Sequence, residues 1–446
     1  MSKLNLEYVM SGMSMTRIVM KYDDKPFYPE FCSVLENLTQ STIKRLSVSN
    51  KNTSSLISCL YNGFTESSLG PMFSSRNKNG CTSLYADSGG LQIITAGKSI
   101  TPELKTKVYE AQAYSDYGFC FDTIPLKSIS SVRSKSERSN VANKLFTYDD
   151  LEDAAKQTGR DIIEQLTYFD KSNASTKGMI IVQGNTWQDM VEWFGHIIKI
   201  VPESLKHKIG GIAVADTCMG NGELESIEML RAVREIHDTH GEEYTKHIHL
   251  LGVGALGRMA PVINLINSGY IGFTEKVSYD STSHTSSAYM GKFFVDGSHK
   301  RVSKYRTPQS EDIFNQIYDR HEGVFAPLID KDKFIDCTFA KKMKGIGDIY
   351  GWDTSATIQH VNENDYWETA CVKLIPYAYV LHTVENFMTC LDKLTENTNI
   401  TSDPISHLCR VKSTDDFDRW YRTFAGTVGS KRISRKLNTL DAFFED

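Results

Sequence analysis

The sequence lacks the features of a membrane or secreted protein. No run of about 18 apolar residues, the length that spans a bilayer, occurs in it. The N-terminal stretch MSKLNLEYVMSGMSMTR is too polar for a signal peptide. The nine cysteines are odd in number and scattered, which favours reduced thiols over a disulfide framework. We therefore expect a cytoplasmic protein with no membrane partner.

An excess of positive charge is also absent. The formal net charge is -5, whereas proteins that bind phosphate backbones usually present a strongly basic surface. Any contact with nucleic acid must therefore be local. Two basic stretches are candidates for it: Lys127–Arg138, in a serine-rich segment, and Lys431–Lys436, near the C-terminus.

What the sequence does contain is a repeated alternation of short apolar runs with stretches of helical periodicity, which is typical of βα units around a parallel sheet. The strands are expected at residues 83–86, 118–121, 178–182, 211–215, 248–253 and 271–279. Helices are expected at residues 102–114, 149–169, 187–200, 224–237 and 259–266, with Thr186 and Asn221 at helix N-caps.

This alternation predicts an α/β protein with a (β/α)8 TIM-type barrel and a helical C-terminal appendage. We expect the barrel within residues 1–345 and the mostly helical appendage within residues 346–446, beginning with a long amphipathic helix from Asp365 to about Leu394. Two further strands are needed to complete the barrel, and we expect them before residue 80 and around residues 320–345.

Each expected strand ends at a polar residue or a glycine. In an α/β barrel such strand ends meet at one mouth, where the active site is built. For each carboxylate alone a turn or a helix cap is the better explanation, but several aimed into one mouth are hard to explain by packing. The residues concerned are Asp87, Asp122, Gln183, Asp216, Gly254 and Asp280.

The sharpest local motif is Asp87-Ser88-Gly89-Gly90 at the end of a strand. Its glycines let backbone N–H groups approach a ligand closely, and its carboxylate can act as a general acid or base. Alone the motif is a common turn, and it gains meaning from the motifs that follow it in order. These are Phe121-Asp122, Val182-Gln183-Gly184, Gly211-Ile212-Ala213-Val214, Gly252-Val253-Gly254 and Tyr279-Asp280.

This ordered set, over about residues 80–300, resembles the queuine/archaeosine tRNA-guanine transglycosylase family. The resemblance implies a pentosyltransferase in which Asp280 attacks the C1′ of a nucleoside and Asp87 manages protons, much as carboxylate pairs do in retaining glycosidases. It also implies that Ser88, Gly89, Asp122, Gln183, Gly184 and Gly254 bind the base. Asp122 and Gln183 would bond its polar edge, and the glycines would leave room for its plane.

The sequence departs from the family at four places. Leu91 stands where an aromatic residue stacks on the base, and Asp216 stands in place of a glycine, near the base edge. Ser281–Ser286 replaces the run after the nucleophile, and His284 within it is a candidate substrate-binding residue or a solvated loop residue. The family's structural zinc motif is absent.

Because Cys337, His360, Cys371 and Cys390 fit no zinc template, we expect no metal and no other cofactor. The departures favour the divergent relatives of phages and bacterial DNA-modification clusters, which insert 7-deazaguanines such as preQ0 into DNA. The expected substrates are therefore DNA and a 7-deazaguanine base, with tRNA as the alternative. If the chain is phage-encoded, its compartment is the host cytoplasm. A homodimer or a helper protein stays open.

Two other functions compete. Gly252-Val253-Gly254-Ala255-Leu256-Gly257 has the spacing of a dinucleotide-binding loop, which would indicate a nicotinamide-dependent oxidoreductase, although four βα units precede it. A non-catalytic nucleic-acid-binding barrel is the second, but such a protein gains nothing from carboxylates beside a polyanion. A serine hydrolase is disfavoured because no G-x-S-x-G motif is present.

Overall fold

The computed structural model describes most of the chain with gaps. The ranges described are residues 4–10, 28–49, 53–62, 82–89, 100–123, 148–184, 186–216, 223–289, 291–302, 306–328, 330–332, 334–335, 366–396 and 400–443.

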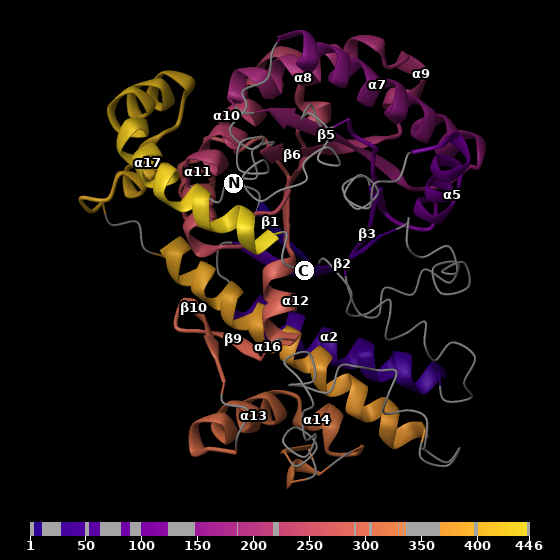
Figure 1. The fold of residues 1–446 in the computed structure, drawn as a ribbon, viewed down its shortest axis with the longest axis vertical. Helices are drawn as coiled ribbons and strands as arrows, with labels where there is room; N and C mark the ends of the chain where they lie inside the picture. The colour runs from indigo at the N-terminus through magenta and orange to yellow at the C-terminus, as the bar shows by residue number, and fades with distance from the viewer. Residues whose placement is uncertain are drawn as a thin grey trace.

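Eight parallel strands close into a barrel, with β1 hydrogen-bonded to both β2 and β8 (Figure 1). The α/β class and the barrel expected from the sequence are therefore confirmed. The strands are β1 (Leu4–Met10), β2 (Thr53–Asn62), β3 (Leu84–Asp87), β4 (Tyr117–Phe119), β5 (Lys177–Gly184), β6 (Ile209–Asp216), β7 (His247–Leu250) and β8 (Lys276–Ser281).

The two strands that the sequence left undetermined both lie at the N-terminus. β1 and β2 precede residue 80, so one expected position is confirmed. The other strand was expected around residues 320–345. This prediction is wrong for the residues of that range that the structure describes, because they form helices and turns up to residue 335. Neither β1 nor β2 has a clear strand pattern, because Glu7 and a run of serines interrupt their apolar residues.

Helices surround the barrel (Figure 1). The central ones match the sequence prediction to within a few residues, and Thr186 forms the expected N-cap as part of a capping box with Asp189. Asn221 lies outside the described residues. The helices are α2 (Tyr28–Ser49), α5 (Pro102–Gln112), α7 (Tyr148–Lys171), α8 (Trp187–Ile200), α9 (Glu203–Lys206), α10 (Glu223–His240) and α11 (Leu256–Ser268), with the short 3₁₀ helix η2 (Glu242–Tyr244) after α10.

After the last barrel strand come mostly helical elements. The hairpin of β9 and β10 is the exception. None of the helices within the described ranges is both long and apolar enough to cross a bilayer. The elements are α12 (Thr282–Tyr289), β9 (Lys292–Val295), β10 (Ser298–Arg301), α13 (Pro308–Arg320), α14 (Glu322–Phe325), α16 (Tyr366–Glu396), η4 (Pro404–Arg410) and α17 (Thr414–Phe443).

The long helix α16 packs directly on the barrel. The hydroxyl of Tyr377 lies 2.6 Å from that of Thr39 on α2, and Tyr279 on β8 donates to the sulfur of Met388 at 2.7 Å. One continuous hydrophobic cluster joins α16 to the barrel core. The helical character expected for the C-terminal region holds for α16 and α17, while a domain boundary at residue 345 falls outside the described residues and stays a prediction.

Candidate active site

The carboxyl ends of the parallel strands gather the polar residues expected from the sequence. Asp87 and Asp216 are the last residues of β3 and β6, and Asp280 is the penultimate residue of β8. Gln183 lies at the end of β5, and Asp122 follows β4 by three residues. All of them stand at the mouth where barrel enzymes place their chemistry.

Asp280 is a buried carboxylate that contacts a backbone N–H group and an imidazole ring. Its Oδ1 accepts a hydrogen bond from the Gly252 backbone N–H at 2.8 Å and lies 3.4 Å from His249 Nε2. Gly252 follows β7 and has a φ of 67°, a conformation that only glycine adopts without strain. The glycine of the Gly252-Val253-Gly254 motif is therefore required by the turn that aims its N–H at Asp280.

Asp87 is held in a similar way, although it lies far from Asp280 in the sequence. The backbone N–H groups of Ser88 and Gly89 hydrogen-bond its carboxylate, and Gly89 also has a positive φ, 72°. Burial raises the pKa of Asp87 to about 6, and the charge of Asp280 adds to this rise against the opposing effect of the two N–H groups. A carboxyl group with such a pKa can both give and accept a proton near neutral pH.

Asp122 and Gln183, which the resemblance assigns to the edge of the base, are hydrogen-bonded to each other in this structure. Gln183 Nε2 donates to Asp122 Oδ2 at 2.5 Å, and both side chains are buried. Burial raises the pKa of Asp122 to about 6, and the charge of Asp87 acts in the same direction. Since Asp87 interacts electrostatically with both Asp122 and Asp280, the structure brings the three carboxylates into one cluster.

The cluster has no cation of its own among the described side chains. No ion pair in the described part of the chain joins Asp87, Asp122 or Asp280 to a lysine or arginine, and the one basic group within 4 Å of Asp280 is His249. A site of this kind attracts a positively charged group or a group that becomes positive during reaction, because its excess negative charge is not neutralised by the protein.

Two glycines assigned to base binding have a packing role in this structure. A Cβ atom on Gly184 would lie 2.7 Å from the backbone nitrogen of Met190, at the start of α8. A Cβ atom on Gly254 would overlap the side chain of Ser281 on β8. Each glycine therefore allows a helix or strand to approach closely, which accounts for it without any ligand.

The remaining two predicted residues have different positions. Asp216 is half-buried and pairs in register with Gly184, on the same rim as the carboxylates. His284 is not in a loop, as expected, but in helix α12, fully buried, with its Nδ1 3.2 Å from His299 Nε2 and its ring against Phe387. Burial, with His299 second, lowers its pKa to about 3, so this histidine is neutral. The ring lies in the core, and it also hydrogen-bonds the backbone of Gly254.

The sequence prediction missed a set of buried polar residues below the mouth. They are Glu7, Tyr85, His247, His249 and Ser278, all of them at most 5 % exposed. A signal was present, because His247 and His249 alternate within an otherwise apolar strand, and alternate residues of a strand share a face. That face is the barrel interior.

Most of the residues considered for a zinc site, and the side chains of both basic stretches, lie outside the described part of the chain. Among the described residues no three His, Cys, Asp or Glu side chains are grouped to hold a metal ion. Cys337, His360 and Leu91 lie outside the described residues, as do the side chain of Cys371 and those of both basic stretches. Cys390 is half-buried and unbonded to another cysteine.

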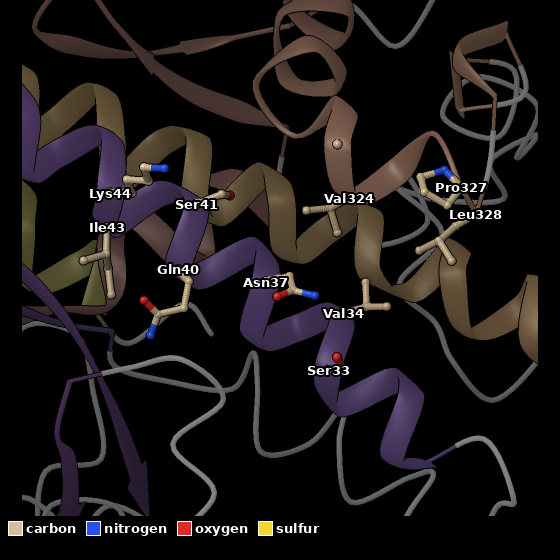
Figure 2. A pocket seen from close by; sticks show the side chains of 11 residues that line it. Ser33, Val34, Asn37, Gln40, Ser41, Ile43, Lys44, Val324, Pro327 and Leu328 are labelled. Carbon is tan, nitrogen blue, oxygen red and sulfur yellow. The ribbon is translucent and has the colours of Figure 1, made fainter.

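A separate cavity lies away from the carboxylates. It has a volume of about 820 Å³ and is formed by one side of α2 and the chain around α14 (Figure 2). Asn37, Ser41 and Lys44 are among its polar lining residues, and none of the strand-end residues contributes to it. This cavity therefore has no part in the candidate active site.

Comparison of the chain with known protein families and with curated proteins finds no match. Its function must therefore be inferred from the geometry of the site and from the motif resemblance.

Proposed function

We propose that this protein is a pentosyltransferase that exchanges guanine in DNA for a 7-deazaguanine base, preQ0 or a related compound, on a barrel of the (β/α)8 TIM type. The observation that carries the proposal is the cluster of Asp87, Asp122 and Asp280 at the barrel mouth, without a lysine or arginine partner among the described residues. An oxocarbenium-like sugar is the positive centre that such a cluster would stabilise.

The reaction begins at Asp280. One carboxylate oxygen forms a bond to C1′ as the bond from C1′ to N9 of guanine breaks, which leaves an aspartyl-sugar ester and a guanine that has gained a proton. In the second step N9 of the incoming base loses its proton and attacks C1′, and the ester bond to Asp280 breaks. No oxidant or energy source is needed, because one glycosidic bond replaces another.

Asp87 is the group that would carry the proton. With a pKa of about 6 its carboxyl group exists in both forms near neutral pH, so it can protonate the leaving guanine and later accept the proton of the incoming base. Asp122 and Gln183 face the same space and can bond the amide edge of the base. A wrong base would leave the buried Asp122 carboxylate with its bond from Gln183 but without one from the base, which costs about 2 kcal/mol.

The experiment is incorporation of labelled guanine or preQ0 by the purified chain into duplex DNA, single-stranded DNA and bulk tRNA. Asp280→Asn is the inactive control. Asp296→Asn is the matched control, because Asp296 is an exposed aspartate in the turn between β9 and β10. Label in DNA alone supports the proposal, whereas label in tRNA assigns the chain to the conventional transglycosylases.

Absence of label from every acceptor, with the wild-type chain folded, would contradict a transglycosylase. Heat protection by a nicotinamide dinucleotide would then indicate the oxidoreductase alternative. Binding of DNA that is unchanged in Asp280→Asn, again without exchange, would indicate the non-catalytic binding barrel.

A further inference from the structure

A continuous column of polar side chains runs along the inside of the barrel below the carboxylate cluster. It begins at Lys276, whose Nζ lies 2.5 Å from Glu7 Oε2. Tyr85 donates its hydroxyl proton to the same Glu7 oxygen at 2.7 Å, and the hydroxyl oxygen lies 3.2 Å from His247 Nε2.

The column continues upward to the candidate nucleophile. His247 Nε2 lies 2.8 Å from the hydroxyl of Ser278, which lies 2.9 Å from His249 Nδ1. The other ring nitrogen of His249, Nε2, faces Asp280 Oδ1 at 3.4 Å. Lys276, Ser278 and Asp280 alternate along β8, so all three side chains point to the interior.

The neighbouring groups determine which atom is the donor in each hydrogen bond of the column. Glu7 in its ion pair accepts only, so Tyr85 must donate to it, and burial raises the pKa of Tyr85 well above its usual range. Burial, with Lys276 second, lowers the pKa of His247, so this ring is neutral and carries one proton. Its Nδ1 has no hydrogen-bond partner among the described groups, which places that proton on Nε2.

This arrangement determines what Ser278 does. Its oxygen accepts from His247 Nε2–H, and its own proton is available to the nearer acceptor, His249 Nδ1 at 2.9 Å, ahead of the Ile248 carbonyl at 3.3 Å. A neutral His249 then carries its proton on Nε2. If His249 is protonated on both nitrogens, an N–H still faces Asp280. The opposite tautomer would set a bare nitrogen against a carboxylate oxygen.

We propose that His249 is a positioning residue for Asp280, and that the column from Glu7 to Ser278 fixes the ring so that its Nε2–H always faces the carboxylate. Together with the Gly252 N–H it holds Oδ1 and leaves Oδ2 directed to the sugar. The orientation of the His249 ring follows from the hydrogen-bond distances and from a neutral His247, whereas the effect on catalysis rests on the proposed function.

The residue types invite a different interpretation, which the geometry opposes. Ser278, His249 and Asp280 are the members of a hydrolase triad, but the serine contacts Nδ1 and the aspartate contacts Nε2, the reverse of that arrangement. Ser278 is also fully buried inside the barrel, where no substrate reaches it. It acts on the ring of His249 and not on a ligand.

The first test does not depend on any activity. Selective ¹⁵N labelling of histidine, with His249→Gln identifying the resonance by its loss, reports which ring nitrogen carries the proton. We expect Nε2 of His249 to be protonated at every pH at which the protein is folded. A bare Nε2 on His249 would overturn the proposal, whether or not the protein exchanges bases.

The second test compares two substitutions at the same position. In His249→Gln the amide can still donate to Asp280, whereas His249→Leu cannot. We expect His249→Leu to lower kcat by about 10²-fold with little change in KM for the base, and His249→Gln to stay within about tenfold of wild type. Circular dichroism and urea unfolding establish that both variants are folded.

Equal losses in the two variants, or full activity in His249→Leu, would contradict a positioning role. If the wild-type chain exchanges no base, the proposed function fails, and the tautomer measurement alone then decides whether His249 holds Asp280.

Discussion

Buried carboxylates lie at both ends of the barrel interior, but the groups that hydrogen-bond or neutralise them differ between the two ends. At the base Glu7 is paired with Lys276 and accepts a hydrogen bond from the hydroxyl of Tyr85. At the mouth Asp87, Asp122 and Asp280 lie beside one another, held by backbone N–H groups, an amide and an imidazole. The protein pairs the first carboxylate with a lysine, whereas the other three have no lysine or arginine partner among the described side chains.

This difference separates structural from functional acids in one fold. A paired buried charge holds strands together, and removing one partner is costly. Clustered acids raise each other's pKa and cost stability, a burden that enzymes carry at sites where charge must change during reaction. Stability and activity should therefore respond in opposite ways when the acids at the two ends are replaced.

The largest effect is expected for Asp280→Asn. Loss of the nucleophile should reduce base exchange by about 10⁴-fold or more, while the free energy of unfolding changes by less than about 1 kcal/mol, because the amide keeps the hydrogen bond from Gly252. Incorporation of labelled base and urea unfolding measure the two quantities. Exchange at a rate comparable to wild type would remove Asp280 from the mechanism.

At the base of the barrel Glu7→Gln should have the opposite outcome. Lys276 would lose its carboxylate, and we expect the free energy of unfolding to fall by about 3 kcal/mol. Base exchange by the folded protein should fall far less than in Asp280→Asn, because Glu7 acts on Asp280 only through the polar column and His249. The double variant Glu7→Gln with Lys276→Met is the control, since removing both charges should recover part of the loss. If the free energy of unfolding were unchanged in Glu7→Gln alone, the ion pair would not contribute to stability.

Asp87→Asn tests the proton-transfer role at the mouth. An amide cannot give up or accept the proton, so we expect exchange to slow by about 10²-fold with the fold intact. The wild-type rate should also follow an ionisation near pH 6, the pKa of this carboxyl group, and in the variant only the part that comes from Asp122, whose pKa is also about 6, should remain. A near-normal rate, or an unchanged pH profile, would exclude Asp87 as the proton carrier.

Asp122→Asn should raise the free energy of unfolding at neutral pH and have little effect in acid. The pKa of Asp122 is about 6 in the folded chain against an ordinary 3.8, so stability from its protonated form is present below pH 3.8 and lost as the pH rises to 6. An asparagine avoids that loss, worth about 3 kcal/mol at pH 7. Urea unfolding at pH 7 and at pH 4 measures it. A gain of equal size at both pH values would show that ionisation of Asp122 is not its cause.

The smallest effect is expected for Gly252→Ala. The added methyl group meets no atom within 4 Å, so the cost comes only from the φ of 67°. We expect a loss of about 1 kcal/mol in stability and a reduction in exchange of about tenfold or less. Gly254→Ala is the matched comparison, because there the methyl group overlaps Ser281. A larger loss at Gly252 than at Gly254 would mean that backbone strain outweighs steric overlap.

Local sequence features predicted the parts of the fold that depend on near neighbours. The N-cap at Thr186 and the span of α8 follow from local residues, and both are confirmed. β1 was not located, because Glu7 interrupts its apolar pattern. The ion pair that makes Glu7 acceptable inside the barrel comes from Lys276, which is distant in the sequence.

By itself the sequence determined the alternation of strands and helices, the acidic residues at strand ends and the glycines that turn the chain beside them. These depend on side-chain periodicity and backbone freedom, which are local properties. Only the tertiary structure decided which strands close the barrel, that Asp87, Asp122 and Asp280 share one mouth, that His284 is buried in the core, and that a polar column supports Asp280. The physical reason is that strands close into a barrel through hydrogen bonds between residues distant in sequence, and only closure turns alternate side chains into one shared interior.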